Sequence, residues 1–217
     1  MQSPGPPLEV KVWGEYACFT RPEMKVERVS YPVMTPSAAR GVLEAIFWKP
    51  EFRWLVREIL VLQEIRIFSI MRNEVGTKAP ASPPSRPYYA DGDRQQRHTL
   101  ALSDVAYIIR ADIELTNRGT GEHPAKYRDQ FRRRVERGEC RHQPYLGCRE
   151  FSAFFAPTTG QEQPITGDLS LGQILFDLDY QGADGRVTPI FFEAVLDNGA
   201  LRVPPQLYQR RGNHAAG

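Results

Sequence analysis

The chain has 217 residues, of which 41% are hydrophobic and 25% charged, and its formal net charge is only +2 at pH 7. These values are typical of a globular protein with a real core. No apolar run approaches the roughly 20 residues that a membrane span needs, so we expect no membrane partner. The three cysteines, Cys18, Cys140 and Cys148, do not pair closely in sequence, and no signal pattern opens the chain. Both features favour a reducing, cytoplasmic location.

The first part of the chain predicts a tail, a strand and a helix. Residues 1–7 are rich in proline and predict a flexible tail, whereas residues 8–13 alternate apolar and polar side chains, as a strand does. Thr35 is a good N-cap and Pro36 a good first residue for a helix that runs through Phe47, and Pro50 ends it.

The middle of the chain predicts strands on either side of a long insertion. Residues 53–72 alternate over one or two strands, and residues 105–115 alternate most clearly of all. Between them, residues 73–103 are rich in proline and charge. A connection of this length inside a compact domain is either functional or disordered.

A basic helix follows. Pro124 suits its first turn and Gly138 its left-handed end, while Tyr127, Phe131 and Val135 recur every four residues on one apolar face. From position 124 to 149 the chain has eight Lys or Arg against three acids, although the whole chain is only +2. Such a concentration of charge points to a polyanion, most simply the phosphates of a nucleic acid; the alternative is a solvated helix surface.

The last predicted elements complete an α+β fold. A strand at about 145–155 gives the order strand, helix, strand, strand, helix, strand, which is that of a ferredoxin-like (RRM-like) βαββαβ domain, a common platform for RNA. We place this domain at residues 8–156, with its insertion at about 73–103. Strands and hairpin turns over residues 165–207 predict a small antiparallel C-terminal β-sheet, and residues 209–217 a second flexible tail.

Metal ligands are scarce in this sequence. Cys140, His142 and Cys148 lie close together, but no second Cys/His pair completes the four ligands of a zinc site. Asp177 and Asp179 share one face of a predicted strand, where two carboxylates are more often plain surface. We therefore expect neither a metal nor a cofactor.

Several blocks of the sequence resemble the Cas-five family of CRISPR-associated proteins, in its I-C subtype, within the RAMP superfamily. The resemblance covers nearly the whole chain. The blocks that carry it are 10–20, 35–41, 47–50, 72–74 and 142–151.

The resemblance implies a function in CRISPR antiviral defence. Members of this subtype bind CRISPR repeat RNA and act as endoribonucleases on precursor CRISPR RNA, by a metal-independent attack of the ribose 2′-OH on the adjacent phosphate. They then hold the 5′ handle of the CRISPR RNA within the type I-C surveillance complex, beside its other subunits. Such a reaction needs a base, a cation and a proton donor at the scissile phosphate.

The chain departs from the family at two catalytic positions. The family's tyrosine at the end of the first helix aligns with Phe47, and its Lys-His pair aligns with Lys126 and Tyr127. Only Lys126 is retained, and a lysine of ordinary pKa is a poor base at neutral pH. Tyr127 has a hydroxyl but lies on the predicted apolar face. His123 and His142, at the two ends of the basic helix, are further candidates because histidine titrates near pH 6.5.

Cations and one aromatic residue are candidate RNA contacts. Trp48 is suited to stack on a base, and the arginines of the insertion to touch RNA or a neighbouring subunit. The candidates are Trp48, Lys49, Arg133, Arg134, Arg137 and Arg141, with Arg94 and Arg97 on the insertion.

Two alternatives to a repeat-specific endoribonuclease stay open. The changes at Phe47 and Tyr127 favour a non-catalytic RNA-binding subunit that only assembles the complex. Binding or cleavage of DNA, including double-stranded DNA, without sequence specificity is a third hypothesis, because phosphate contacts carry no sequence information.

Overall fold

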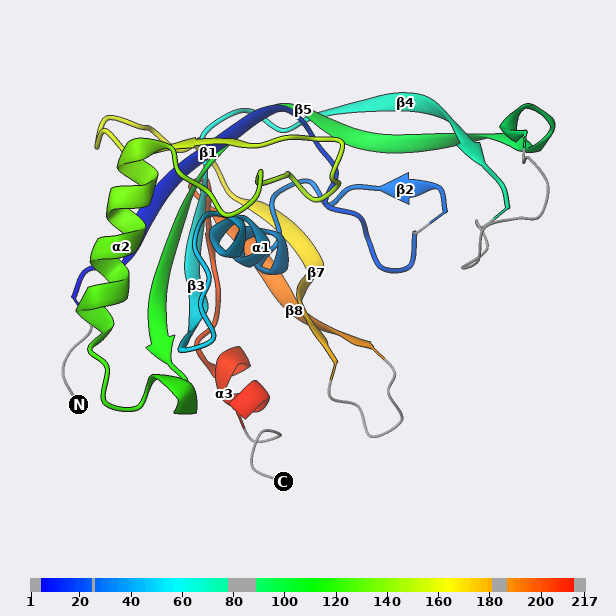
Figure 1. The fold of residues 1–217 in the computed structure, drawn as a ribbon. Helices are drawn as coiled ribbons and strands as arrows, with labels where there is room; N and C mark the ends of the chain where they lie inside the picture. The colour runs from blue at the N-terminus through cyan, green and yellow to red at the C-terminus, as the bar shows by residue number, and fades with distance from the viewer. Residues whose placement is uncertain (1–4, 25, 78–88, 181–186, 213–217) are drawn as a thin grey trace.

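The computed structural model describes residues 5–24, 26–77, 89–180 and 187–212. In this part of the chain nine strands form one strongly curled sheet with three helices (Figure 1), so the chain is of the mixed α+β class, as predicted. The strands are β1 Leu8–Ala17, β2 Arg28–Val29, β3 Phe52–Val61, β4 Arg66–Val75, β5 Arg94–Leu115, β6 Phe154–Ala156, β7 Leu169–Asp179, β8 Thr188–Asp197 and β9 Ala200–Arg202. The helices are α1 Pro36–Ile46, α2 Pro124–Arg137 and α3 Gln206–Gly212, with 3₁₀ turns at Ala90–Asp93 and Asn117–Gly119.

The sheet has the strand order β6-β1-β5-β3-β9-β8-β7, and β2 and β4 pair with β5. The pairs β1–β6, β1–β5 and β3–β5 are antiparallel. Helices α1 and α2 pack on the same side of the sheet, so the inward side chains of the strands form one core with the helices. Val10, Val12 and Ile109 in this core have no exposed surface.

Helix α1 begins where its sequence predicts. The Thr35 hydroxyl accepts the N–H of Ala38 at 3.2 Å, and Pro36 is the first helical residue. The helix ends at Ile46, one residue before its predicted end, because Phe47 is already extended. None of the helices in the described residues is long and apolar enough to cross a membrane.

Strand β5 is twice as long as the alternating pattern predicted. It begins at Arg94, and its first half pairs with β4, so that Val75 lies opposite Arg94 and Arg66 opposite Ser103. These two strands form an arm that projects from the body of the sheet (Figure 1). The insertion predicted over residues 73–103 is therefore not a mere connection, because its two ends belong to β4 and β5. Residues 78–88 of that insertion lie outside the described residues.

The strand predicted at about 145–155 is instead mostly a folded loop. Only β6 and one bridge between Tyr145 and Ser152 are extended there. Leu146 donates its N–H to the Phe151 carbonyl at 2.8 Å, within the loop itself. Gly147 has a positive φ of 84°, and a Cβ there would lie 2.1 Å from the Cys18 carbonyl oxygen. The loop is thus fixed against the chain at Cys18.

The C-terminal strands extend the main sheet rather than forming a sheet of their own. β9 pairs with β3, with Leu201 opposite Ile59. Asn198 and Gly199 have the positive φ values, 46° and 75°, of a tight hairpin turn, as predicted. The predicted tail is wrong for positions 209–212, which belong to α3, and residues 1–4 and 213–217 lie outside the described residues.

Candidate functional site

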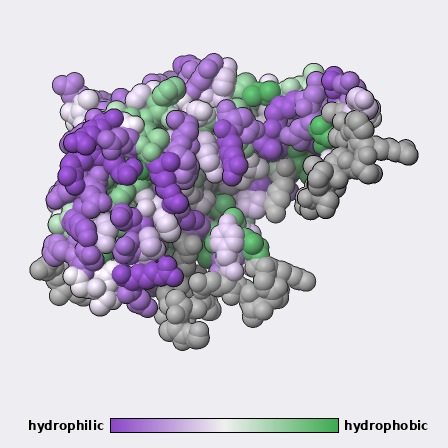
Figure 2. All heavy atoms as spheres, viewed as in Figure 1, coloured by the Kyte–Doolittle hydropathy of each residue, from purple (hydrophilic) through white to green (hydrophobic). Residues whose placement is uncertain are grey.

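Helix α2 separates an apolar face from a cationic one. The His123 ring caps its start, and Gly138 ends it with a φ of 65°. Tyr127, Phe131 and Val135 are buried to 1%, 1% and 4% exposure, so the predicted apolar face is confirmed. Hydrophilic side chains gather over α2 on the face shown in Figure 2. Arg128 is buried at 9% exposure, whereas Lys126, Arg132, Arg133 and Arg137 of this helix are exposed to solvent.

Lys126 lies on the first turn of α2 with half of its side chain exposed. Its Nζ donates to the Glu122 carboxylate at 2.8 Å, and this hydrogen bond raises the pKa of Lys126 above its ordinary value. Lys126 is consequently a cation at neutral pH. It can stabilise negative charge, but it has no lone pair to accept a proton.

Tyr127 and Phe47 both pack on the same buried ring. The Phe52 ring lies 5.3 Å from the Phe47 ring and 5.2 Å from the Tyr127 ring, centre to centre. Phe47 is 3% exposed and Tyr127 1% exposed, and burial raises the pKa of the Tyr127 hydroxyl. The two positions at which the sequence departs from the expected catalytic residues are thus packed into the core.

The two candidate histidines lie at opposite ends of α2, which is about 20 Å long. His123 Nδ1 accepts the N–H of Ala125 at 3.2 Å, so it caps the helix within one turn of Lys126. His142 lies beyond the other end, where its N–H contacts the Ala45 carbonyl at 3.3 Å. Both rings are exposed. The structure brings His123, but not His142, to the end of α2 that carries Lys126.

The C-terminal end of α1 meets the C-terminal end of α2 in a cationic, aromatic surface. The Arg141 guanidinium lies 5.0 Å from the centre of the Trp48 ring, and that of Arg134 lies 5.5 Å from the Phe47 ring. Arg134 also donates to the Ile46 carbonyl at 3.4 Å, where the helix end is partially negative. We call Trp48, Arg134 and Arg141 the α1-end cluster. It combines the ring and the charges that a single-stranded nucleic acid requires.

Three further predicted RNA contacts are close in sequence to the residues of this cluster. Lys49 and Arg133 are exposed and make no ion pair among the described residues, whereas Arg137 lies 3.7 Å from Glu139. Exposed, weakly engaged cations remain available to phosphates. All three belong to the same end of the molecule as the α1-end cluster or to the exposed face of α2.

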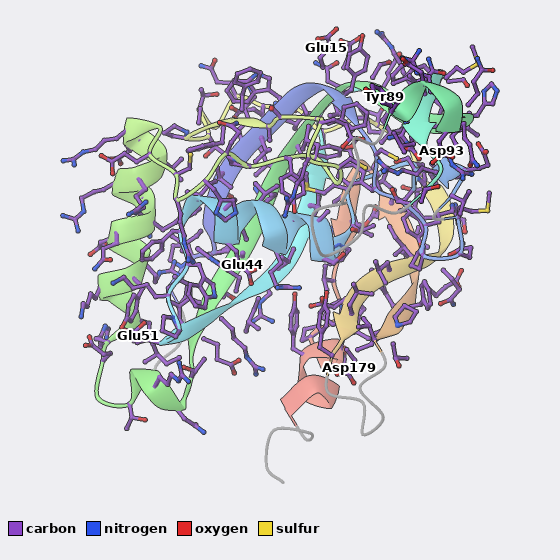
Figure 3. All side chains as sticks on the ribbon, turned by 45° about the vertical axis from the view of Figure 1, so that its right-hand side comes forward. Glu15, Glu44, Glu51, Tyr89, Asp93 and Asp179 are labelled. Carbon is purple, nitrogen blue, oxygen red and sulfur yellow. The ribbon has the colours of Figure 1, made fainter. Side chains whose placement is uncertain are left out.

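Arg94 and Arg97 are not brought to this surface. They lie on β5 in the arm, where Arg94 pairs with Asp91 and Arg97 lies 3.6 Å from Glu74. In Figure 3 the labelled Tyr89 and Asp93 lie on the side of the molecule opposite to Glu51, which is near the start of α2.

Comparison with known families identifies the chain. Residues 7–204 match the model of the CRISPR-associated protein (Cas_Cas5) family, in its Cas5d form. The chain belongs to the Cas5d family. The curated CRISPR pre-crRNA endoribonuclease Cas5d of Thermus thermophilus is 49% identical over 218 residues, which is 93% of each chain. The protein of the same name from Mannheimia succiniciproducens is 45% identical over 216 residues, 91% of this chain and 95% of its own.

Solved structures agree on the fold of this Cas5d chain. A crystal structure of a CRISPR-associated protein superposes with a TM-score of 0.69 at 22% identity, over 94% of this chain and 96% of the other. The functionally uncharacterised SMU1763c of Streptococcus mutans superposes with a TM-score of 0.67 at 21% identity, over 92% of both chains.

No group of three His, Cys, Asp or Glu residues in the described part of this Cas5d chain could hold a metal. Cys148 contacts Cys18 rather than Cys140, since its Sγ lies 3.5 Å from the Cys18 carbonyl oxygen. Asp177 is engaged by Arg40 at 2.8 Å.

Sequence reasoning missed a polar network between the loop and the arm of this Cas5d chain. Arg28 Nη1 lies 2.8 Å from Glu150 and 3.4 Å from the Cys148 Sγ, and Arg72 binds the same Glu150 at 3.0 Å. A hydrogen bond from the Cys18 thiol lowers the pKa of Cys148 to about 6. No pattern in the sequence predicts the contact of Cys18 with Cys148, because the two cysteines are 130 positions apart.

Proposed function

We propose that this chain is an endoribonuclease that cleaves precursor CRISPR RNA within its repeat. The observation that carries the proposal is its identity of 49% and 45%, over more than nine-tenths of its length, with two pre-crRNA endoribonucleases. The cationic face of α2 and the α1-end cluster support a polyanionic substrate.

We infer that strands β6-β1-β5-β3 and helices α1 and α2 are the ferredoxin-like core of a RAMP domain. Their order along the chain and their antiparallel pairing support this inference. The β4–β5 arm is then an elaboration of its third strand, and β9, β8 and β7 continue its open edge.

The proposed reaction uses the RNA's own 2′-oxygen as the nucleophile. That oxygen bonds to phosphorus and the bond to the 5′-oxygen breaks. The 2′-OH loses a proton and the 5′-oxygen gains one, which leaves a 2′,3′-cyclic phosphate and a 5′-hydroxyl. Lys126 supplies the permanent cation for the charge that develops on the phosphorane.

We assign proton transfer to His123, one turn from Lys126. Its Nδ1 accepts the Ala125 N–H, which holds the ring at the start of α2. Tyr127 takes a structural role, since its ring is buried against Phe52. His142 is the second candidate for proton transfer, and it lies at the end of α2 that carries the α1-end cluster.

RNA binding is the part of the proposal with the broadest support. Trp48 stacks on a base, while Arg133, Arg137, Arg141 and Lys49 neutralise phosphates. We propose that the same surface keeps the 5′ handle after cleavage, when the protein joins the other subunits of a type I-C surveillance complex.

A non-catalytic RNA-binding subunit is the second candidate function. The burial of Phe47 and Tyr127 at two family catalytic positions is the observation that favours it. Binding or cleavage of DNA without sequence specificity is third. It predicts an affinity that is almost wholly electrostatic and equal for unrelated sequences.

The deciding experiment is cleavage of the cognate repeat RNA in EDTA. We expect one cut, abolished by a 2′-deoxy substitution at the cut site and slowed about 10²–10³-fold by Lys126→Ala. Arg132→Ala is the matched control, because Arg132 is equally exposed and pairs with Asp129 on the same helix. Tight binding without a cut would establish the second candidate. Equal affinity for unrelated DNA would establish the third.

A further inference from the structure

A cleft that the proposed function does not use lies beside α1, away from the α1-end cluster. It is a cleft of about 320 Å³ between α1, the fixed loop after Pro144, and β7. Both α1 and β7 contribute lining residues, and Figure 3 labels Glu44 on α1 and Asp179 on β7. A volume of this size is at the lower end of small-molecule sites. The residues that matter here are Phe19, Arg40, Gly41, Tyr145, Asp177 and Tyr180.

Gly41 is the first sign of a ligand in this cleft. It lies in the interior of α1, where glycine lowers helix stability relative to alanine. A Cβ at Gly41 would meet no atom within 4 Å, and its φ is an ordinary helical one. Packing and backbone geometry therefore do not require a glycine. Because Gly41 has no side chain, the helix backbone is exposed where it lines the cleft. A ligand can then approach that backbone closely.

Two tyrosines stand in the walls of the cleft with exposed surface. Tyr145 is 37% exposed, although the loop that carries it is fixed by its bridge to Ser152 and by the Leu146 contact with Cys18. Tyr180 follows β7 and is 62% exposed. Phe19 and Leu175 add buried apolar surface. The cleft thus offers preformed flat and apolar walls to a planar ring.

The charges in the cleft disfavour a phosphate. Arg40 donates to Glu44 at 2.8 Å and to Asp177 at 2.8 Å, so its one positive charge meets two carboxylates. Both terminal nitrogens of Arg40 are therefore engaged by carboxylates and are not offered to a phosphate. An uncharged ring with polar edges fits better, since guanidinium and carboxylate groups can both hydrogen-bond to it.

We propose that this cleft binds one unpaired nucleobase of the RNA, extruded from its stack. The inference rests on the proposed function and adds a specificity site to it. The phosphates are held on the cationic surface at the C-terminal end of α1, which begins about 8 Å along the helix from Gly41. Base recognition and phosphate binding are thereby assigned to different parts of the surface around α1.

Binding of repeat RNAs that each carry one abasic site tests the proposal. For the wild-type protein, we expect one abasic position to weaken binding about tenfold. Gly41→Leu, which fills the cleft with a good helix former, should weaken binding of the intact RNA to the same extent and remove the sensitivity to that position. Tyr180→Ala should weaken binding, whereas Tyr89→Ala, at an exposed tyrosine of the arm, should not.

Thermal unfolding of each variant shows whether it is folded. The inference would be overturned if both Gly41→Leu and Tyr180→Ala bound every RNA in the set with the affinity of the wild-type protein. Cleavage in EDTA and the phosphate contacts would then be intact, so the proposed function would stand. If the wild-type protein bound no repeat RNA, the proposed function itself would fail and the inference with it.

Discussion

The Arg141 guanidinium lies 5.0 Å from the centre of the Trp48 ring, and the Arg141 N–H donates to the Ala45 carbonyl at 2.8 Å. A flat ring and a cation are thus held at one fixed place on the end of α1. The pair separates the two contributions to RNA affinity, stacking and charge, in residues that can be changed one at a time.

The salt dependence of RNA binding should distinguish these contributions. Arg133→Ala removes one phosphate contact, so the slope of log K against log salt should fall by about 0.7 for a single-stranded RNA. Trp48→Ala should weaken binding with little change in slope, because stacking releases no counterion. Fluorescence anisotropy over a salt series measures both. Arg94→Ala, on the arm, is the control; a slope change there equal to that of Arg133→Ala would contradict the placement of the RNA.

His123→Asn should separate helix capping from proton transfer. Asparagine also caps helices well, so the free energy of unfolding should stay near that of the wild type. It cannot transfer a proton near neutral pH, so single-turnover cleavage should slow by about 10²–10⁴. His98→Asn, on the arm, is the matched control. Cleavage by His123→Asn at the wild-type rate would move the proton transfer to another group.

Tyr127→Phe should cleave RNA at the wild-type rate. The hydroxyl that it removes belongs to a ring with 1% exposure, packed on Phe52. Phe52→Ala should instead lower the free energy of unfolding by about 3–5 kcal/mol, because it leaves a cavity beneath both Phe47 and Tyr127. Urea unfolding and single-turnover cleavage check the two variants. If Tyr127→Phe cleaved RNA much more slowly but kept its stability, the Tyr127 hydroxyl would have a catalytic role.

Cys148 should make stability depend on pH. Its folded pKa of about 6 is below the value of roughly 8.5 for a free thiol, because the Cys18 thiol donates a hydrogen bond to it. A lowered folded pKa contributes stability that is fully present above the unfolded pKa and is lost as pH falls through the folded pKa. The free energy of unfolding should therefore decline from about pH 8.5 to pH 6. Cys148→Ser should flatten this dependence in urea titrations, and an unchanged curve would contradict it.

Local signals predicted α1 and α2 well, α3 was missed, and non-local pairing limited the prediction of the strands. Thr35, Pro36, Pro124 and Gly138 act within a turn of their own positions, so the starts of α1 and α2 and the end of α2 could be predicted. The first half of β5 has polar residues on both faces and is a strand because β4 pairs with it. No periodicity within β5 contains that information.

The candidate site divides in the same way. The basic face of α2 and its buried stripe follow from helical spacing, and the His123 cap follows from its position before Pro124. The contact of Arg141 with Trp48 and the pairing of Arg40 with Asp177 join segments that are far apart in sequence. The positions of His123 and His142 at the two ends of α2 followed from the sequence, whereas the α1-end cluster could be recognised only after folding.

Two glycines with equal room for a side chain should respond to alanine with opposite signs. A Cβ at Gly41 or at Gly138 would meet nothing within 4 Å. Gly41 has a helical backbone, so Gly41→Ala should raise the free energy of unfolding by about 0.5–1 kcal/mol. Gly138 has a φ of 65°, where a Cβ is strained, so Gly138→Ala should lower it by about 1–2 kcal/mol. Urea unfolding of both variants measures the pair. If Gly41→Ala were destabilising, the glycine would be required by the fold itself, and its bare backbone would no longer point to a ligand in the cleft.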